Sequence, residues 1–221
     1  MDRATPWVVL VTDPRVPLSR TLEVVRAAAA ALGPDRLLVQ LRDKEASQDD
    51  LLEAARALRK ATCEARARLV VNGSSSVALA AGADGVHFPK TSPTELVHLV
   101  RAARGLLGAE AIVTTVAHDD DDVTRASEAG ATGVLVSPIF ATPGKGAPRG
   151  VAALTAARAI VDAMRRSPRL LVVALGGVTS QNAAACLLAG AAGVAAIRAL
   201  YDAPASLAAF GASGAARSPA P

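Results

Sequence analysis

The chain has few aromatic side chains and no basic run interleaved with them. Phe, Trp and Tyr make up 2% of its 221 residues. Nucleic-acid-binding surfaces commonly combine aromatic stacking platforms with a basic groove, so we expect no nucleic-acid partner. Apolar residues still account for 51% of the chain, and the core must therefore be built from Ala, Val and Leu. This composition favours helices packed on a buried parallel sheet, and thus the α/β class.

Cysteines and long apolar runs are also scarce. Cys63 and Cys186 fall within expected helices without partners at metal-ligand spacing, so neither a disulfide framework nor a zinc site is predicted. No stretch approaches the roughly 18 apolar residues of a membrane span, and the apolar run near the start is too short for a signal peptide. We therefore expect a cytoplasmic protein with no membrane partner. The net charge of +4 suits anionic small molecules.

Short runs of Val, Leu and Ile alternate with Ala-rich segments of helical length along the chain. This alternation predicts eight strands joined by helices. The predicted strands are Trp7–Thr12, Arg36–Leu41, Arg68–Asn72, Gly85–Phe88, Ala111–Val116, Gly133–Val136, Leu170–Leu175 and Gly193–Ile197. The predicted helices span residues 18–32, 47–65, 74–81, 92–107, 120–129, 150–165, 179–189 and 203–210.

The connections between these segments indicate how the strands assemble. Ala-Gly-Ala recurs at residues 81–83, 129–131 and 189–191, where glycine suits the left-handed position after a helix. Eight βα units can close on themselves, which removes both edges of the sheet. We therefore predict a single (βα)8 TIM barrel over residues 1–210 and a disordered tail at 211–221, which has little bulky apolar sequence. The sequence is compatible with a homo-oligomer but does not define one.

Reactive side chains in such barrels gather at the C-terminal ends of the strands. The second predicted strand leads into Gln40, Arg42 and Lys44, of which residues 40 and 42 share one face. An arginine fork beside a mobile lysine suits a phosphate or diphosphate. The alternative is a solvated turn in which Asp43 pairs with a neighbouring cation.

The seventh and eighth predicted strands end in Gly176-Gly177 and Ile197-Arg198. Two glycines let the backbone approach an anion, and a helix start beyond them supplies unpaired N–H groups. We predict a phosphate site here, where such barrels commonly have one. The sixth strand continues into a Gly/Pro loop at residues 137–146 that carries Lys145. This loop is predicted to be a lid, and the alternative is a structureless connection.

His118 follows the fifth predicted strand. An imidazole can move protons near neutral pH, so this residue is the candidate catalytic group. The aspartates at 119–122 are more typical of a helix N-cap than of a metal site. His87, at the end of the fourth strand, is consistent with a packed core histidine, and His98 with a helix surface.

Taken in order, these motifs resemble the thiamine phosphate synthase and thiazole tautomerase (TenI-type) superfamily from about Val9 to Leu200. The matching segments are VTD at 11–13, VQLRDK at 39–44, LVVNG at 69–73, GADGVHFP at 82–89, His118, SPIFATPGKG at 137–146, VALGGVTSQN at 173–182 and GVAAIRAL at 193–200. The resemblance implies a small phosphorylated thiazole as substrate. Asn72, in the third of these segments, is a further candidate binding residue.

The two branches of this superfamily differ in their chemistry. Synthases join an aminopyrimidine diphosphate to a thiazole phosphate, and two family carboxylates bind the Mg²⁺ that neutralises the departing diphosphate. The corresponding positions here are Gly73 and Ser92. Because Mg²⁺ needs hard oxygen ligands, the loss of both carboxylates argues against metal-assisted ionisation. Our first hypothesis is therefore a thiazole tautomerase without a metal or other cofactor, in which His118 shifts a proton.

Two alternatives stay open. Gln40, Arg42, Lys44 and Lys145 match the pyrimidine and diphosphate contacts of family synthases, which keeps a Mg²⁺-dependent synthase acting on both substrates as the second hypothesis. The third is a non-catalytic protein that binds thiazole phosphate. A phosphate anchor is common to all three, so Gly176 and Gly177 do not discriminate among them.

Overall fold

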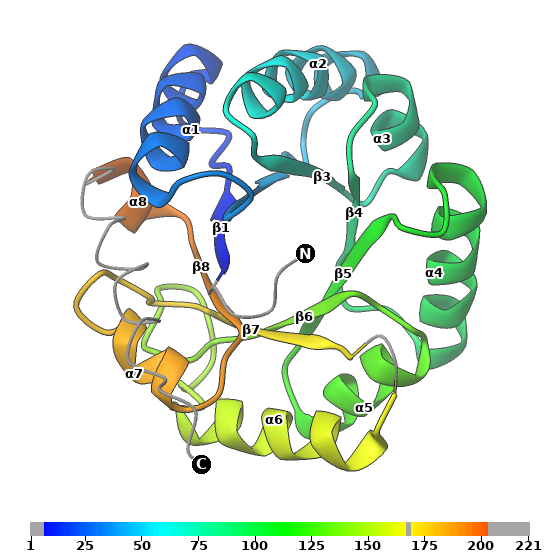
Figure 1. Ribbon diagram of the computed structural model, residues 1–221, viewed down its shortest axis with the longest axis vertical. Coiled ribbons are helices and arrows are strands. Elements are labelled where there is room, and N and C mark those ends of the chain that lie inside the picture. The colour runs from blue at the N-terminus through cyan, green and yellow to red at the C-terminus, as the bar shows by residue number, and fades with distance from the viewer. Residues whose placement is uncertain (1–6, 167–168, 203–221) are drawn as a thin grey trace.

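Eight parallel strands form a closed barrel, with helices between successive strands (Figure 1). This computed structural model describes residues 7–166 and 169–202. The strands are β1 (Trp7–Val11), β2 (Leu37–Leu41), β3 (Arg68–Asn72), β4 (Gly85–Phe88), β5 (Ile112–Ala117), β6 (Gly133–Val136), β7 (Leu171–Leu175) and β8 (Gly193–Ala196). The helices are α1 (Leu18–Leu32), α2 (Gln48–Glu64), α3 (Ser75–Ala81), α4 (Pro93–Leu107), α5 (Asp120–Glu128), α6 (Ala152–Met164), α7 (Ala183–Leu188) and α8 (Arg198–Asp202). The predicted (βα)8 barrel is confirmed.

The inner face of the barrel changes from apolar to polar along its axis. Its apolar part contains Trp7, Val9, Val11, Leu38, Val70, Ile112, Leu135, Val173 and Ala195. Side chains alternate across a strand, so the residue two positions further along points the same way. On β2, β3 and β5 those positions are Gln40, Asn72 and Thr114. The polar end of the interior is therefore the C-terminal mouth of the barrel.

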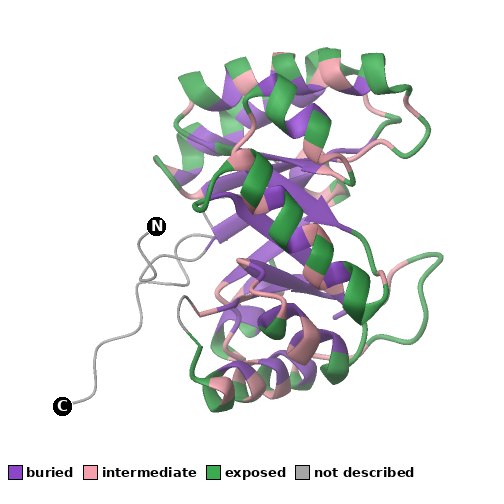
Figure 2. Ribbon diagram, turned by 90° about the vertical axis from the view of Figure 1, so that its right-hand side faces the viewer, coloured by how far each residue is buried: buried purple, intermediate pink, exposed green. Residues whose placement is uncertain are grey.

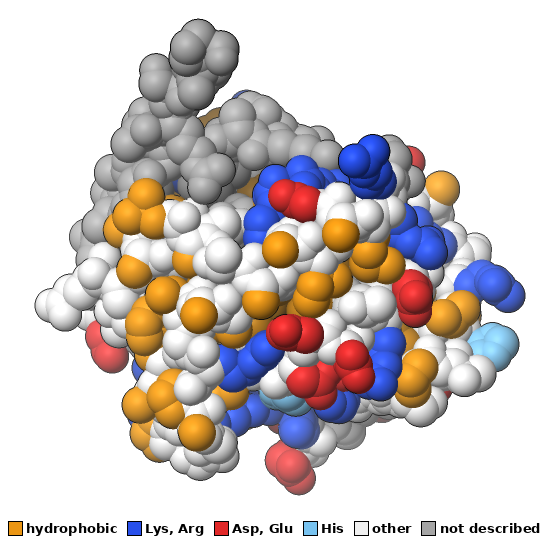
Figure 3. Space-filling model, turned by 90° about the horizontal axis from the view of Figure 1, so that it is seen from below, with side chains coloured by type: hydrophobic (Ala, Val, Ile, Leu, Met, Phe, Trp, Pro, Cys, Tyr) orange, Lys and Arg blue, Asp and Glu red, His pale blue; other side chains and the backbone are white. Residues whose placement is uncertain are grey.

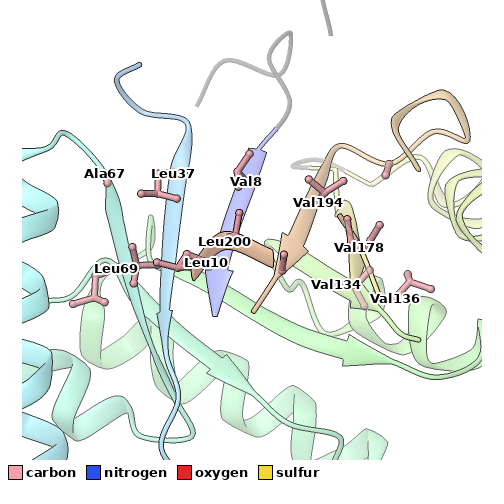
Figure 4. Packing of buried hydrophobic residues seen from close by; sticks show 14 of the residues in the cluster. Val8, Leu10, Leu37, Ala67, Leu69, Val134, Val136, Val178, Val194 and Leu200 are labelled. Carbon is pink, nitrogen blue, oxygen red and sulfur yellow. The ribbon is translucent and has the colours of Figure 1, made fainter. Parts of the chain in front are cut away.

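The outer faces of the strands pack against the helices. Figure 4 shows this layer, in which Val8, Leu10, Leu37, Leu69 and Val194 are buried. The helices contribute small alanine side chains to the same cluster, which lets them lie close to the sheet. Figure 2 shows the result: the strands are buried in the centre and the outward helix faces are exposed.

The surface carries charges of both signs. On the face drawn in Figure 3, acidic and basic side chains lie beside one another with separate apolar side chains between them.

Among the described residues, no helix is long and apolar enough to cross a membrane. Cys63 is exposed and Cys186 is buried, and both are free thiols.

The predicted element boundaries need small corrections, mainly near the C-terminus. The helix predicted at 179–189 is shorter, because the Asn182 side chain bonds to the Thr179 N–H and the Gly177 carbonyl, and α7 begins only at Ala183. Strand β8 ends at Ala196, one residue earlier than predicted, and α8 begins at Arg198. The helix predicted at 203–210 and the tail predicted at 211–221 lie outside the described residues.

The packing of β3 against the helices gives a test of the core. Leu69 is fully buried, whereas Leu188, at the end of α7, is 80% exposed. We expect Leu69→Ala to lower the free energy of unfolding by about 2–5 kcal/mol, since it removes buried methyl groups and leaves a cavity. The matched change Leu188→Ala is expected to stay within about 0.5 kcal/mol of the wild type. Chemical denaturation measures both, and equal effects would contradict this packing.

Candidate functional site

The mouth of the barrel holds a cavity of about 280 Å³ lined from all sides of the sheet. Its lining includes the predicted residues Gln40, Arg42, Lys44, Asn72, His118, Lys145, Gly176 and Ile197. A second cavity of about 340 Å³ holds the other two, Gly177 and Arg198. Both cavities share Thr142, Leu175, Gly176 and Ile197, so they are neighbouring parts of one mouth. The structure thus brings every predicted site residue together.

At the end of β2, the backbone is fixed while the Arg42 and Lys44 side chains face the cavity. The Thr12 hydroxyl accepts a hydrogen bond from the Arg42 N–H at 2.8 Å. Gln40 is buried, and its Nε2 donates to Asn72 Oδ1 at 3.2 Å, which links the ends of the neighbouring strands β2 and β3. Asp43 Oδ1 accepts from the N–H groups of Glu45 and Ala46. Asp43 therefore closes the turn through backbone N–H groups, and among the described residues it forms no ion pair with a neighbouring cation.

His118 lies at the rim of the cavity in a defined orientation. Its Nδ1 is 2.9 Å from the carbonyl oxygen of Ser137. A carbonyl can only accept, so Nδ1 carries the hydrogen, and Nε2 of the neutral ring has a free lone pair. The His118 backbone N–H donates to Asp122 Oδ2 at 2.9 Å. This arrangement leaves Nε2 available as a base.

The aspartates after His118 cap helix α5. Asp119 Oδ1 accepts from the Asp122 N–H at 2.7 Å, so the predicted N-cap is confirmed. The same backbone hydrogen bond is the main cause that lowers the pKa of Asp119, and Lys90 adds to it. Lys90 Nζ donates to Asp122 Oδ2 at 2.8 Å and to Asp119 Oδ2 at 3.3 Å. The aspartates thus connect α5 to the loop after β4.

His87 lies beneath the mouth and is buried. Its Nδ1 is 2.9 Å from Thr114 Oγ1 on the neighbouring strand. Burial lowers the pKa of His87 to about 4, and the nearby Arg42 guanidinium contributes to the shift. The ring is therefore neutral at physiological pH. It fits the core histidine expected from the sequence, although it also lines the cavity.

Gly176 and Gly177 are required first by packing. Both have positive φ angles, of 96° and 64°. A Cβ at Gly176 would lie 2.8 Å from Pro138 Cα, and one at Gly177 would lie 2.7 Å from Phe140 Cβ. The Ile139 and Phe140 N–H groups donate to the carbonyls of Leu175 and Gly176, both at 2.9 Å. The glycine pair therefore allows the loop after β6 to lie against the end of β7.

The same segment also has donors for an anion. Gly177 and Val178 line the second cavity together with Arg198. Within the described part of the chain, neither the Gly177 nor the Val178 N–H donates a hydrogen bond. Two free N–H groups beside an arginine suit a phosphate. Packing and anion binding are therefore compatible uses of this glycine pair.

The loop after β6 is fixed at its base and exposed at its tip. The Arg149 N–H donates to the Pro138 carbonyl at 2.8 Å, and the Arg149 side chain bonds to Asp120 Oδ1 at 2.6 Å. Residues 143–148, which include Lys145, are exposed. Lys145 nevertheless lines the cavity. Closure of this loop as a lid stays a prediction.

The side chains that line the 280 Å³ cavity do not fit Mg²⁺. The 280 Å³ cavity is lined by four cationic side chains, Arg42, Lys44, Lys90 and Lys145, and its described lining contains no carboxylate. Gly73 donates its N–H to the His87 carbonyl, and the Ser92 side chain caps α4. Mg²⁺ is bound through carboxylates and phosphate oxygens, so these residues offer it no protein ligand of the usual kind.

Sequence reasoning did not select His87, Ser137 or Thr142 as parts of the mouth. The alternation of side chains along β4 and β6 would have predicted His87 and Ser137, because both lie at inward positions near the ends of these strands. The contribution of Lys90 depends on its contact with Asp122, which is 32 residues away in the chain. No local pattern reports such a contact.

The close approach of the β6 loop to Gly177 gives a test. We expect Gly177→Ala to lower the free energy of unfolding by roughly 1–3 kcal/mol, because the new methyl group meets Phe140 and the residue keeps a left-handed conformation. Gly146→Ala is the matched control, since no atom lies within 4 Å of a Cβ there. Denaturation curves compare the two, and an unchanged Gly177→Ala protein would contradict the packing.

The burial of His87 predicts a specific pH dependence. The ordinary pKa of 6.5 applies in the unfolded chain, whereas the folded value is about 4. The unfolded state therefore binds the proton first, and stability falls as the pH drops from about 6.5 towards 4. We expect the free energy of unfolding of His87→Gln to depend less steeply on pH over this range. The glutamine amide can still form a hydrogen bond to Thr114. Denaturation at several pH values measures the difference, and identical slopes would contradict a neutral buried His87.

Comparison with known proteins places this geometry in a family. The family model described as thiamine monophosphate synthase matches residues 8–200. The thiamine-phosphate synthase of Methanoculleus marisnigri is 40% identical over 195 residues, which cover 86% of this chain and 85% of that protein. The protein of the same name from Moorella thermoacetica is 38% identical, covering 83% of this chain and 81% of its own.

A solved structure leads to the same family. The thiamine phosphate pyrophosphorylase of Pyrococcus furiosus superimposes with a TM-score of 0.75 and 26% identity. The superposition covers 96% of this chain and 97% of that one. The family match thus spans nearly all of the described barrel, from β1 to α8. The chain belongs to the thiamine monophosphate synthase family.

Proposed function

We propose that the chain is a thiamine-phosphate synthase, which joins an aminopyrimidine diphosphate to a thiazole phosphate and releases diphosphate. The observation that carries this proposal is a pair of neighbouring cavities at one mouth, each of which has cationic side chains in its lining. One contains Gly177, Val178 and Arg198. The other contains Arg42, Lys44, Lys90 and Lys145. A reaction between a phosphate and a diphosphate substrate needs two such regions, whereas a single phosphorylated thiazole needs fewer cations.

In this reaction the bond between the pyrimidine methylene carbon and the diphosphate oxygen breaks, and its electron pair leaves with the diphosphate. The thiazole nitrogen then forms a bond to the same carbon. The cations of the larger cavity would hold the diphosphate and stabilise its growing negative charge. Arg198 and the Gly177 N–H would hold the thiazole phosphate, and so direct the thiazole ring towards the shared cavity wall.

The names of the relatives support the synthase over the tautomerase that our reading of the sequence put first. Both curated relatives described above are named thiamine-phosphate synthase. One observation favours the tautomerase as the second candidate: the hydrogen bond to Ser137 leaves the Nε2 lone pair of His118 free among the described residues, and the described lining of the 280 Å³ cavity has no carboxylate for Mg²⁺. In that reaction Nε2 would take a proton from the thiazole ring and return it at another position.

The two activities are separated by direct assays on the purified protein. We expect diphosphate release from the aminopyrimidine diphosphate that depends on added thiazole phosphate. Conversion of a thiazole carboxylate phosphate tautomer to its aromatic form, without diphosphate release in the first assay, would instead establish the tautomerase. Binding of thiazole phosphate without turnover in either assay would reject both and leave a non-catalytic binder.

A substitution at the phosphate region tests the proposed division of the mouth. We expect Arg198→Met to raise the KM for thiazole phosphate by about tenfold to a hundredfold, the cost of losing a hydrogen bond to a charged group. The KM for the aminopyrimidine diphosphate should change little. Arg101→Met, on the exposed face of α4, is the matched control. Equal effects on both KM values would contradict separate regions.

A further inference from the structure

The two positions at which the family resemblance places metal carboxylates have other uses in this chain. Gly73 has a φ of 77° and donates its N–H to the His87 carbonyl at 2.8 Å. Ser92 accepts a hydrogen bond from the Glu95 N–H and so begins α4. Neither residue brings a negative charge to the cavity. The side of the mouth formed by β3 and β4 must neutralise an anionic ligand in some other way.

Lys90 lies on this side, in the loop between β4 and Ser92. It lines the same cavity as Asn72 and His87. Its Nζ is held by Asp122 at 2.8 Å and by Asp119 at 3.3 Å. An ammonium group has three N–H donors, so two contacts fix its position and one donor is left for a ligand. Asp122 is itself fixed, because only 7% of its side chain is exposed and it also accepts from the His118 N–H.

The lining of this cavity carries an excess of positive charge. The aspartates at 119–122 are paired with Lys90, Arg125 and Arg149. In the described part of the chain, Arg42, Lys44 and Lys145 form no ion pair with a carboxylate, and all three line the cavity. The described lining of that cavity contains no acidic side chain. A polyanion would therefore meet three uncompensated cations and one that is held in place.

We propose that this mouth binds a diphosphate without a divalent cation, and that Lys90, held by Asp119 and Asp122, occupies the role of the metal. Arg42, Lys44 and Lys145 complete the site from β2 and the β6 loop. The inference rests on the proposed synthase function in one respect, since that reaction supplies the diphosphate ligand. The site itself is defined by binding and is tested without turnover.

The contacts of Lys90 keep it charged. The hydrogen bond to Asp122 is the main cause that raises the pKa of Lys90 above its ordinary value of 10.5. The ammonium form is therefore present at all physiological pH values. A lysine in this environment carries one positive charge where Mg²⁺ would carry two, and the three neighbouring cations supply the remainder.

Calorimetric titration of inorganic diphosphate into the purified protein in excess EDTA tests the proposal. We expect saturable binding in EDTA, and no tighter binding when Mg²⁺ replaces the EDTA. Lys90→Gln should weaken this binding about tenfold or more, since it removes a charge-assisted hydrogen bond. Lys90→Arg should retain most of it. Lys60→Gln, on the exposed face of α2, is the matched control and should bind as the wild type does.

Two results would overturn the proposal. One is binding that appears only when Mg²⁺ is added, which would mean that other donors hold a metal. The other is binding in EDTA that Lys90→Gln leaves unchanged while its thermal unfolding matches the wild type. Failure of the proposed synthase reaction is a separate outcome: it would appear as metal-free diphosphate binding without diphosphate release from substrates.

Discussion

Each strand of the barrel is hydrogen-bonded in parallel to its neighbours, from β1 to β8 and back to β1. Closure brings the C-terminal ends of all strands to one mouth, and strand alternation decides which side chains face it. Gln40, Asn72 and His87 meet there although they are far apart in the chain. The apolar layer beneath them fills the barrel, so a ligand is confined to this end. The location of the site thus depends on closure more than on any one motif.

The loop after β6 depends on the same ring of strands. Its first residues continue the pairing between β6 and β7, through the hydrogen bonds of Ile139 and Phe140. This continuation is sterically allowed because positions 176 and 177 have no side chains. The glycine pair therefore affects two functions at once: it brings Lys145 and Thr142 towards the mouth and leaves backbone N–H groups beside Arg198. Phosphate binding alone would explain only part of the need for glycine at these two positions.

The sequence was sufficient for the order of strands and helices and for most of the polar residues at the mouth, although not for His87, Ser137 or Thr142. Both follow from patterns of short range: alternation along strands, helix periodicity and motifs at strand ends. The start of α7 was missed because the Asn182 side chain delays the helix. The contact between Lys90 and Asp122 was missed because it joins two loops through side chains alone. Asp43 was given a cation partner among its alternatives, but the backbone N–H groups of its own turn bind it instead.

The chemistry depends on how negative charge is neutralised. A divalent cation and a set of fixed ammonium and guanidinium groups can both stabilise a departing diphosphate. They differ in the protein ligands that must lie near the diphosphate. Mg²⁺ needs carboxylates near the ligand, and the described lining of this cavity has none. Cations held by carboxylates outside the cavity, as Lys90 is by Asp122, bring positive charge to the ligand while the negative charge stays behind them. On our proposal, a mouth without the metal carboxylates keeps the capacity to bind diphosphate, so their absence is not by itself an argument for a reaction without a diphosphate.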